Sequence, residues 1–153
     1  MDNFYRLLEQ IKNIASNSEF TNMVSFGDIT DVDLGKRSNF PLVHILVDNA
    51  NITEKTIDFT VKILACDIVD QVKKKVSNDV FYGNNNVQDI LNSQLYVITL
   101  LVNKLKRLDL SDTEFLRVEE DVLVEPFLDR FENELAGWEA TITIKTMNNV
   151  SIC

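Results

Sequence analysis

The clearest pattern along the chain is an alternation of apolar and polar side chains between residues 57 and 66. A period of two places one set on the buried face of a strand: Ile57, Phe59, Val61, Ile63 and Ala65. The preceding run, Leu42–Val47, is apolar except at His44, which predicts a second strand that is covered on both faces. Residues 48–56 are too polar to bury, so they predict either a projecting ribbon that continues both strands or a flexible tip.

Helical spacing of apolar residues predicts two helices. The first begins at a cap provided by Asp2 or Asn3 and runs to about Ala15. The second, residues 87–108, is the longest predicted element, and its apolar stripe is widened by Leu95 and Val97. Such a stripe indicates cover on more than one side, either by the sheet and the first helix or by a neighbouring subunit.

Three weaker patterns predict further strands. Phe20–Leu34 favours a strand entered through Gly27, with these apolar positions: Phe26, Ile29, Val32 and Leu34. The segment 122–131 predicts a strand that Pro126 interrupts, and therefore an edge strand or a bulge. Gly137 is expected to open the last strand, whose apolar set alternates with polar residues: Trp138, Ala140, Ile142 and Ile144.

The segment 69–86 predicts a polar arm. Three consecutive lysines, residues 73–75, could contact phosphate or an acidic partner, but a charged edge that discourages strand pairing is the favoured interpretation. The expected fold class is therefore α+β, with a mostly antiparallel sheet packed against an N-terminal helix and one long central helix. We expect residues 1–153 to form one domain with projecting segments at 48–56 and 69–86.

Composition narrows the possible functions. The net charge of −9 argues against a surface that grips nucleic acid, although it is compatible with a surface past which DNA slides. No apolar run is long enough to span a bilayer, and the N-terminus has no signal-peptide pattern. Two cysteines, Cys66 and Cys153, lie far apart without metal-ligand spacing, which fits a reducing compartment.

No catalytic or metal signature stands out among the candidate residues. His44 could act as a general base with Asp58 or Asp67, but no triad or nucleophile-elbow spacing accompanies it, so a packed histidine is favoured. The acidic residues of 28–33 lack the glycine and late glutamate of a calcium loop. Cys66 is expected to be a small buried hydrophobe. The sequence predicts no enzyme activity, no cofactor and no metal.

Two stretches carry a resemblance to a known family. The first is the strand Ile63-Leu64-Ala65-Cys66-Asp67-Ile68-Val69, followed by the polar arm and by Val87-Gln88-Asp89-Ile90-Leu91-Asn92. The second is Phe131-Glu132-Asn133-Glu134-Leu135-Ala136-Gly137-Trp138, which leads into Ala140-Thr141-Ile142-Thr143-Ile144. With the order of elements, these stretches resemble tail terminator and head–tail connector (neck ring) proteins of tailed bacteriophages, and are similar to small virion proteins of crAss-like phages.

The resemblance implies a structural virion protein that forms a ring, six- or twelve-fold, joining or capping the DNA conduit of the portal–neck–tail region. Implied partners are further copies of the chain, the portal, a neighbouring neck ring or tail proteins, and passing DNA without sequence-specific binding. The host cytoplasm is the expected place of assembly, with no membrane partner. Expected contact residues lie in both projections: Asn49, Asn51, Glu54, Val72, Lys73, Lys74, Val76, Phe81 and Tyr82. The alternatives are a cytosolic protein-binding module without catalytic activity and, third, an enzyme that uses His44.

Overall fold

The computed structural model describes residues 3–28, 39–70, 76–77, 80, 82–83, 85–111, 116–129 and 135–150. Their elements follow one another as α1 (Asn3–Ser16), β1 (Met23–Phe26), β2 (Leu42–Ile52), β3 (Thr56–Ile68), β4 (Val76–Ser77), β5 (Tyr82–Gly83), α2 (Asn85–Ser111), β6 (Leu116–Val118), β7 (Leu123–Asp129) and β8 (Leu135–Met147). The predicted α+β class is confirmed, since two helices accompany a six-stranded, mostly antiparallel sheet.

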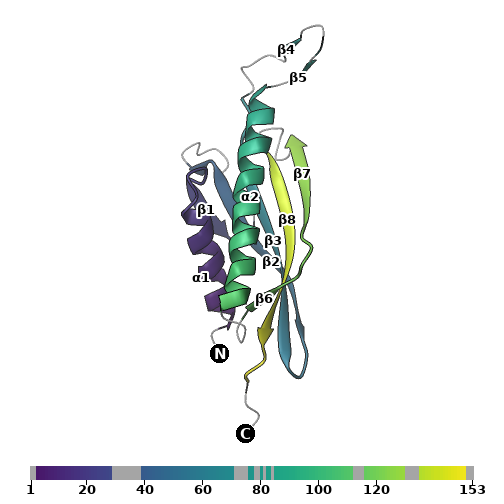
Figure 1. The fold of residues 1–153 in the computed structure, drawn as a ribbon. Helices are drawn as coiled ribbons and strands as arrows, with labels where there is room; N and C mark the ends of the chain where they lie inside the picture. The colour runs from purple at the N-terminus through teal and green to yellow at the C-terminus, as the bar shows by residue number, and fades with distance from the viewer. Residues whose placement is uncertain are drawn as a thin grey trace.

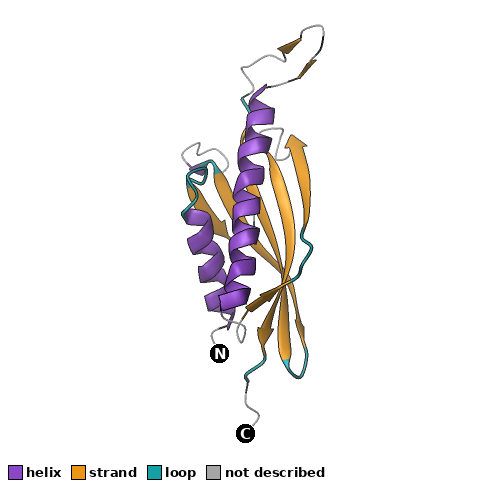
Figure 2. Ribbon diagram, in the orientation of Figure 1, coloured by secondary structure: helices purple, strands orange, loops and turns teal. Residues whose placement is uncertain are grey.

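The large sheet has the order β1-β2-β3-β8-β6, and β7 also pairs with β8. Only β1 and β2 are parallel, and the long strands β2, β3 and β8 pair antiparallel along most of their length. Both helices lie on the same face of this sheet (Figures 1 and 2). The small hairpin of β4 and β5 stands at the opposite end of the molecule from the β2–β3 turn (Figure 1).

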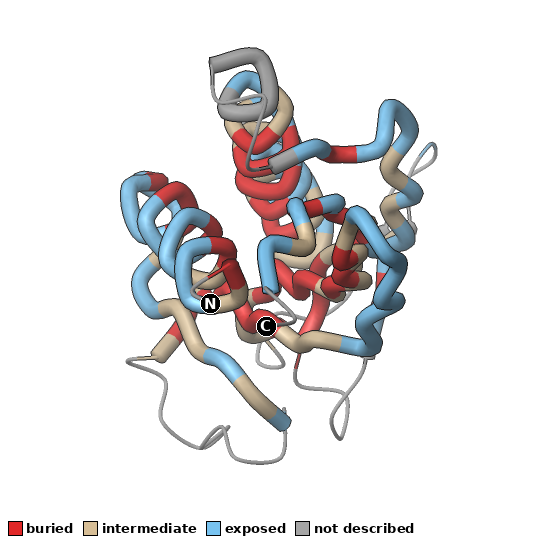
Figure 3. Tube along the Cα trace, turned by 90° about the horizontal axis from the view of Figure 1, so that it is seen from below, coloured by how far each residue is buried: buried red, intermediate tan, exposed pale blue. Residues whose placement is uncertain are grey.

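The main core forms where the helices meet the sheet. Leu7 and Ile11 of α1 and Leu101 of α2 are almost fully buried against alternating residues of the central strands, among them Val61 and Ile142. In the tube coloured by burial, the buried positions gather between the helices and the strands (Figure 3). Burying one such side chain stabilises a fold by about 1.5–3 kcal/mol, so packing holds both helices against the sheet.

The face of the sheet away from the helices is divided. At one end it carries a second apolar cluster, formed by these residues: Phe40, Leu42, Leu64, Cys66, Phe127 and Leu135. Toward the other end of the same face, the directly paired Thr60 and Thr143 are half-buried and Lys145 is exposed. One end of this face is therefore part of the core, whereas the other end is polar and solvent-facing.

The segment that begins at Phe20 contains a short strand, β1, of which the predicted set includes only Phe26. β1 ends at Phe26, directly before Gly27, and a strand entered through Gly27 would lie almost wholly outside the described residues. Gly27 has a left-handed backbone, with φ of 114°, which glycine adopts without strain and which turns the chain at the end of β1. Ile29, Val32 and Leu34 lie outside the described residues.

The last strand also differs at its start. β8 begins at Leu135, and Gly137 lies inside the strand, opposite Cys66. A Cβ atom at this glycine would stand 2.0 Å from the carbonyl oxygen of Ala65. The position therefore requires glycine for close strand approach and not for a turn.

Two other elements extend the predicted pattern. α2 runs three residues beyond its expected end, to Ser111, and β6 was not predicted.

β7 pairs only with β8 among the described strands, with Pro126 opposite Trp138, so the predicted edge strand is confirmed. Among the described residues, neither helix combines the length and the apolar character needed to cross a bilayer.

Candidate functional site

The most unusual surface of the molecule is the second half of β2, Asp48–Ile52, which we call the free half of β2. β1 pairs with β2 only from Leu42 to Ile45, so beyond that point no described strand covers the outer edge of β2. A register shift between Val47 and Asn49 marks a β-bulge. From Asp48 onward every residue is exposed, and Ile52 reaches 71%. The chain thus presents an ordered strand with one open edge.

The hairpin turn that ends this strand is held by several hydrogen bonds. The backbone N–H of Thr53 donates to the carbonyl of Thr56 at 2.8 Å, and the N–H of Thr56 donates to Thr53 Oγ1 at 2.9 Å. Asn148, just after β8, donates from its backbone to the carbonyl of Lys55 and from Nδ2 to the carbonyl of Thr53. Of the two alternatives for residues 48–56, the structure therefore has the paired ribbon, with only residues 53–55 as the connection.

The structure divides the expected contact residues into two groups. Asn49 and Asn51 are exposed on the free half of β2, paired with Thr60 and Asp58, and Glu54 is exposed in the turn. Val76 and Tyr82 belong to the β4–β5 ladder at the other end of the molecule (Figure 1). Four further residues lie outside the described part of the chain: Val72, Lys73, Lys74 and Phe81. The two groups therefore cannot form one continuous surface on a single copy.

His44 is packed, as the favoured interpretation predicted. It is 1% exposed, with Nδ1 at 2.7 Å from Ser25 Oγ and Nε2 at 2.7 Å from the carbonyl oxygen of Gly27. A neutral ring with its proton on Nε2 satisfies both contacts, because it donates to the carbonyl and accepts from the hydroxyl. The ring ties β2 to the end of β1.

The carboxylates considered as partners of His44 are not beside it. His44 is paired with Leu64. Asp58 lies six residues before Leu64 in β3, which places it about 20 Å from Leu64 at the strand rise. Asp67 is three residues from Leu64, so its side chain points to the opposite face of the sheet. The structure does not bring these three residues together.

Cys66 is a fully buried thiol whose Sγ lies 3.7 Å from the carbonyl oxygen of Leu42. Burial raises the pKa of Cys66 to about 12, and the nearby charge of Asp67 adds to the effect. The prediction of a small buried hydrophobe is confirmed. Across the described ranges, no group of three or more His, Cys, Asp or Glu residues is placed to hold a metal ion.

An apolar groove runs between α1 and β1, with a volume of about 410 Å³. Tyr5 and Leu8 line it from the helix, and Val24 and Phe26 from the strand. Tyr5 is 75% exposed and Phe26 is 54% exposed, which is unusual for neighbouring aromatic side chains. The spacing of these residues does not predict the groove, because nothing in it indicates that the two segments meet.

Comparison with known proteins adds no assignment. No protein-family model matches the chain, and no curated protein matches it either. The features that bear on function are therefore the free half of β2, the groove and the order of elements.

Proposed function

We propose that this protein is a structural virion component that assembles into a ring in the portal–neck–tail region of a tailed phage. The ring would join or cap the conduit through which DNA passes. The observation that carries the proposal is the free half of β2: five consecutive exposed residues in an ordered strand with an open outer edge. The class of virion protein is proposed because the order of elements resembles that of tail terminator and neck ring proteins.

An open strand edge favours association with another chain. Unpaired backbone N–H and C=O groups on an edge are a template for strand pairing, and stable monomers protect such edges. Here the bulge at Asp48 limits the template without covering it. A second copy that supplies a different surface would make a heterologous contact, and heterologous contacts close into rings when the rotation fits.

The overall charge is consistent with a DNA conduit. A chain with a net charge of −9 does not attract phosphate, so DNA can move past it without adhering. In this proposal the protein performs no catalysis and binds no cofactor, and its copies, the portal and tail proteins are its partners.

The test is the state of the purified full chain in solution. We expect light scattering to give a concentration-dependent six- or twelve-fold species, and negative-stain images to show annuli. Asp48→Pro, which distorts the exposed strand next to its bulge, should reduce the assembled fraction. Leu123→Ser is a control for an exposed position on another strand, because Leu123 is 67% exposed. A compact monomer at all concentrations, with and without portal or tail proteins, would overturn the proposal.

The groove between α1 and β1 favours a second candidate function, a protein-binding module. The exposed aromatic rings of Tyr5 and Phe26 are typical anchors for a partner side chain. This alternative predicts a stable monomer or dimer in which Phe26→Ser abolishes capture of a partner. It also predicts that changes in the free half of β2 leave capture unaffected, which separates it from ring assembly.

A further inference from the structure

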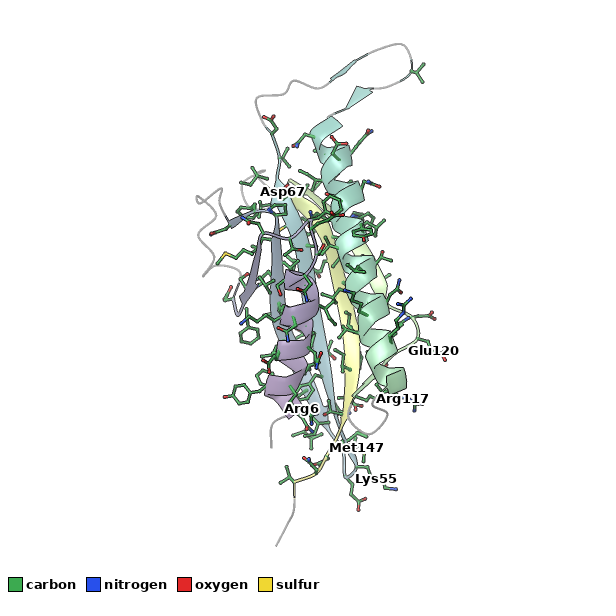
Figure 4. All side chains as sticks on the ribbon, turned by 60° about the vertical axis from the view of Figure 1, so that its left-hand side comes forward. Arg6, Lys55, Asp67, Arg117, Glu120 and Met147 are labelled. Carbon is green, nitrogen blue, oxygen red and sulfur yellow. The ribbon has the colours of Figure 1, made fainter. Side chains whose placement is uncertain are left out.

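A pocket of about 550 Å³ lies between the amino-terminal half of α2 and the end of β3. Asp67 of β3 lies on one wall, and Asp89, Gln94 and Tyr96 of α2 lie on another, with Phe20 nearby. Figure 4 places Asp67 beside the upper part of α2, far from the β2–β3 turn marked by Lys55. The volume is within the range of sites that hold small ligands, about 300–1,000 Å³.

The wall formed by α2 has an acceptor without a donor. Gln94 is 1% exposed, and its Nε2 donates to Ser93 Oγ at 3.4 Å. The Ser93 hydroxyl in turn donates to the carbonyl of Ile90, while Gln94 Oε1 is buried without a hydrogen-bond partner among the described residues. An unsatisfied buried acceptor costs about 1–3 kcal/mol, so this oxygen favours a ligand that brings an N–H group.

The pocket also has negative charge without a counterion. Two of its lining residues are aspartates, and no lysine, arginine or histidine is among the described residues that line it. Asp67 Oδ1 accepts the backbone N–H of Ile68 at 2.8 Å. Burial raises the pKa of Asp67 above its ordinary value, and the hydrogen bond from Ile68 only partly opposes this effect. A bound cation would relieve the cost of a partly buried carboxylate.

An aromatic pair completes the site. The rings of Phe20 and Tyr96 lie 5.6 Å apart in an edge-to-face arrangement, and both residues line the pocket. A flat cation can stack on such a ring while its edge donates hydrogen bonds. The positive end of the α2 dipole acts within the first turn, where Asn86 lines the pocket, whereas Gln94 and Tyr96 belong to the third turn. A cation held by Gln94 and Tyr96 would therefore lie beyond the first turn.

We propose that this pocket binds a guanidinium group. A guanidinium has five N–H donors in one plane, carries the missing positive charge and stacks on aromatic rings. One edge would donate to the Asp67 carboxylate and, once the buried Gln94 amide turns toward the pocket, to Gln94 Oε1, and the face would lie against Tyr96. The group can come from free arginine or from an arginine side chain of another protein chain. The site does not depend on ring assembly.

The test is a titration of the full ¹⁵N-labelled chain followed by NMR. The probes are free arginine, the blocked N-acetyl-arginine-N-methylamide, and the neutral N-acetyl-citrulline-N-methylamide as a control of equal shape. We expect both arginine compounds to shift the backbone amide of Ile68 and the side-chain amide of Gln94 in a saturable way, and the citrulline compound to leave both unchanged. Tighter binding of the blocked compound would identify a protein side chain as the source, and tighter binding of free arginine a metabolite.

Variants locate the site. Asp67→Asn should weaken binding about tenfold or more, because a charge-assisted hydrogen bond is lost, and Gln94→Leu should weaken it by a smaller factor. Glu9→Gln removes the same charge from an exposed position on α1 and should leave binding unchanged. Equal shifts with the citrulline compound, wild-type affinity in Asp67→Asn, or no saturable shift, as in a pocket that holds only water, would each overturn the proposal.

Discussion

The two halves of β2 are paired with the same strand, yet they differ in what covers them. Leu42–Ile45 lies between β1 and β3 and is completely buried, whereas the free half, Asp48–Ile52, has β3 on one side only and is exposed throughout. Both halves keep strand geometry. The difference shows that ladder hydrogen bonds and a well-held turn suffice to order a ribbon, while burial of side chains supplies the stability.

The comparison also separates two roles within one element. The buried half anchors the sheet through His44 and the apolar cluster around Leu42. The free half has only exposed residues and an outer edge that no described strand covers, so it is available for contact with another chain. Predictions that contrast the two halves therefore test whether stability and assembly reside in different parts of the same strand.

The largest contrast concerns thiol reactivity. In a Cys153→Ser background, native Cys66 should react with a thiol reagent at least about 10³-fold more slowly than a cysteine introduced by Ala50→Cys in the free half. The reason is that burial raises the pKa of Cys66 to about 12 and closes access to it, while Ala50 is exposed. Absorbance kinetics near pH 8 measure both rates. Equal rates would contradict the burial of Cys66.

The next largest effect is expected at Gly137, which is paired with Cys66 beside the buried half. Gly137→Ala should destabilise the protein by more than about 3 kcal/mol, because a Cβ atom cannot fit against the Ala65 carbonyl without backbone movement. Urea denaturation followed by circular dichroism gives the free energy of unfolding. If this variant were as stable as the wild type, the close approach of β3 and β8 would be wrong.

A matched pair of isoleucines compares the halves directly. Ile45→Ala should cost about 2–5 kcal/mol in free energy of unfolding, because Ile45 is 2% exposed. Ile52→Ala, the same substitution in the free half, should change it by less than about 0.5 kcal/mol. Denaturation of both variants as monomers measures the difference, and comparable losses would show that the free half is part of the core.

The smallest effect is the pH dependence due to Asp67, at the buried end of β3. Its pKa in the folded state is raised by burial, so the folded protein is penalised once this carboxyl ionises. The penalty is complete above the folded pKa and absent below the unfolded value of about 3.8. Asp67→Asn should therefore stabilise the protein at pH 7, and the gain should disappear on acidification.

Thermal denaturation at pH 7 and near pH 4 measures this effect. Asp48→Asn, at the exposed bulge, is the matched control and should leave the melting temperature almost unchanged at both values. A loss of stability in Asp67→Asn at pH 7 would show that the charged carboxylate is stabilising in the folded state.

The local patterns predicted much of the fold. The alternation in 57–66 gave the buried face of β3, with Ile57, Val61 and Ile63 all buried, and helical spacing gave both helices. Pro126 marked an edge strand because proline lacks the N–H that a central position requires. These features depend on the chemistry of residues that are close in the sequence.

The features that the sequence did not predict depend on contacts between residues that are distant in the chain. The parallel partner of β2 could not be identified, because nothing in Met23–Phe26 specifies pairing with Leu42–Ile45. The role of Gly137 was mistaken, because its constraint is the carbonyl of Ala65, seventy-two residues earlier. The pocket around Asp67 and Gln94 was not foreseen for the same reason, since its walls come from separate segments.

The sequence by itself determined the class of the fold, the buried faces of its main strands and helices, and the polar character of residues 48–56. Only the tertiary structure decided that this polar segment is a paired ribbon with an open edge, and that Gln94 faces an acidic pocket. The physical reason is how far apart in the sequence the residues lie that determine each feature. Periodicity reports which side of an element is buried, whereas strand partners, close approaches and pockets are set by side chains that meet only after the chain has folded.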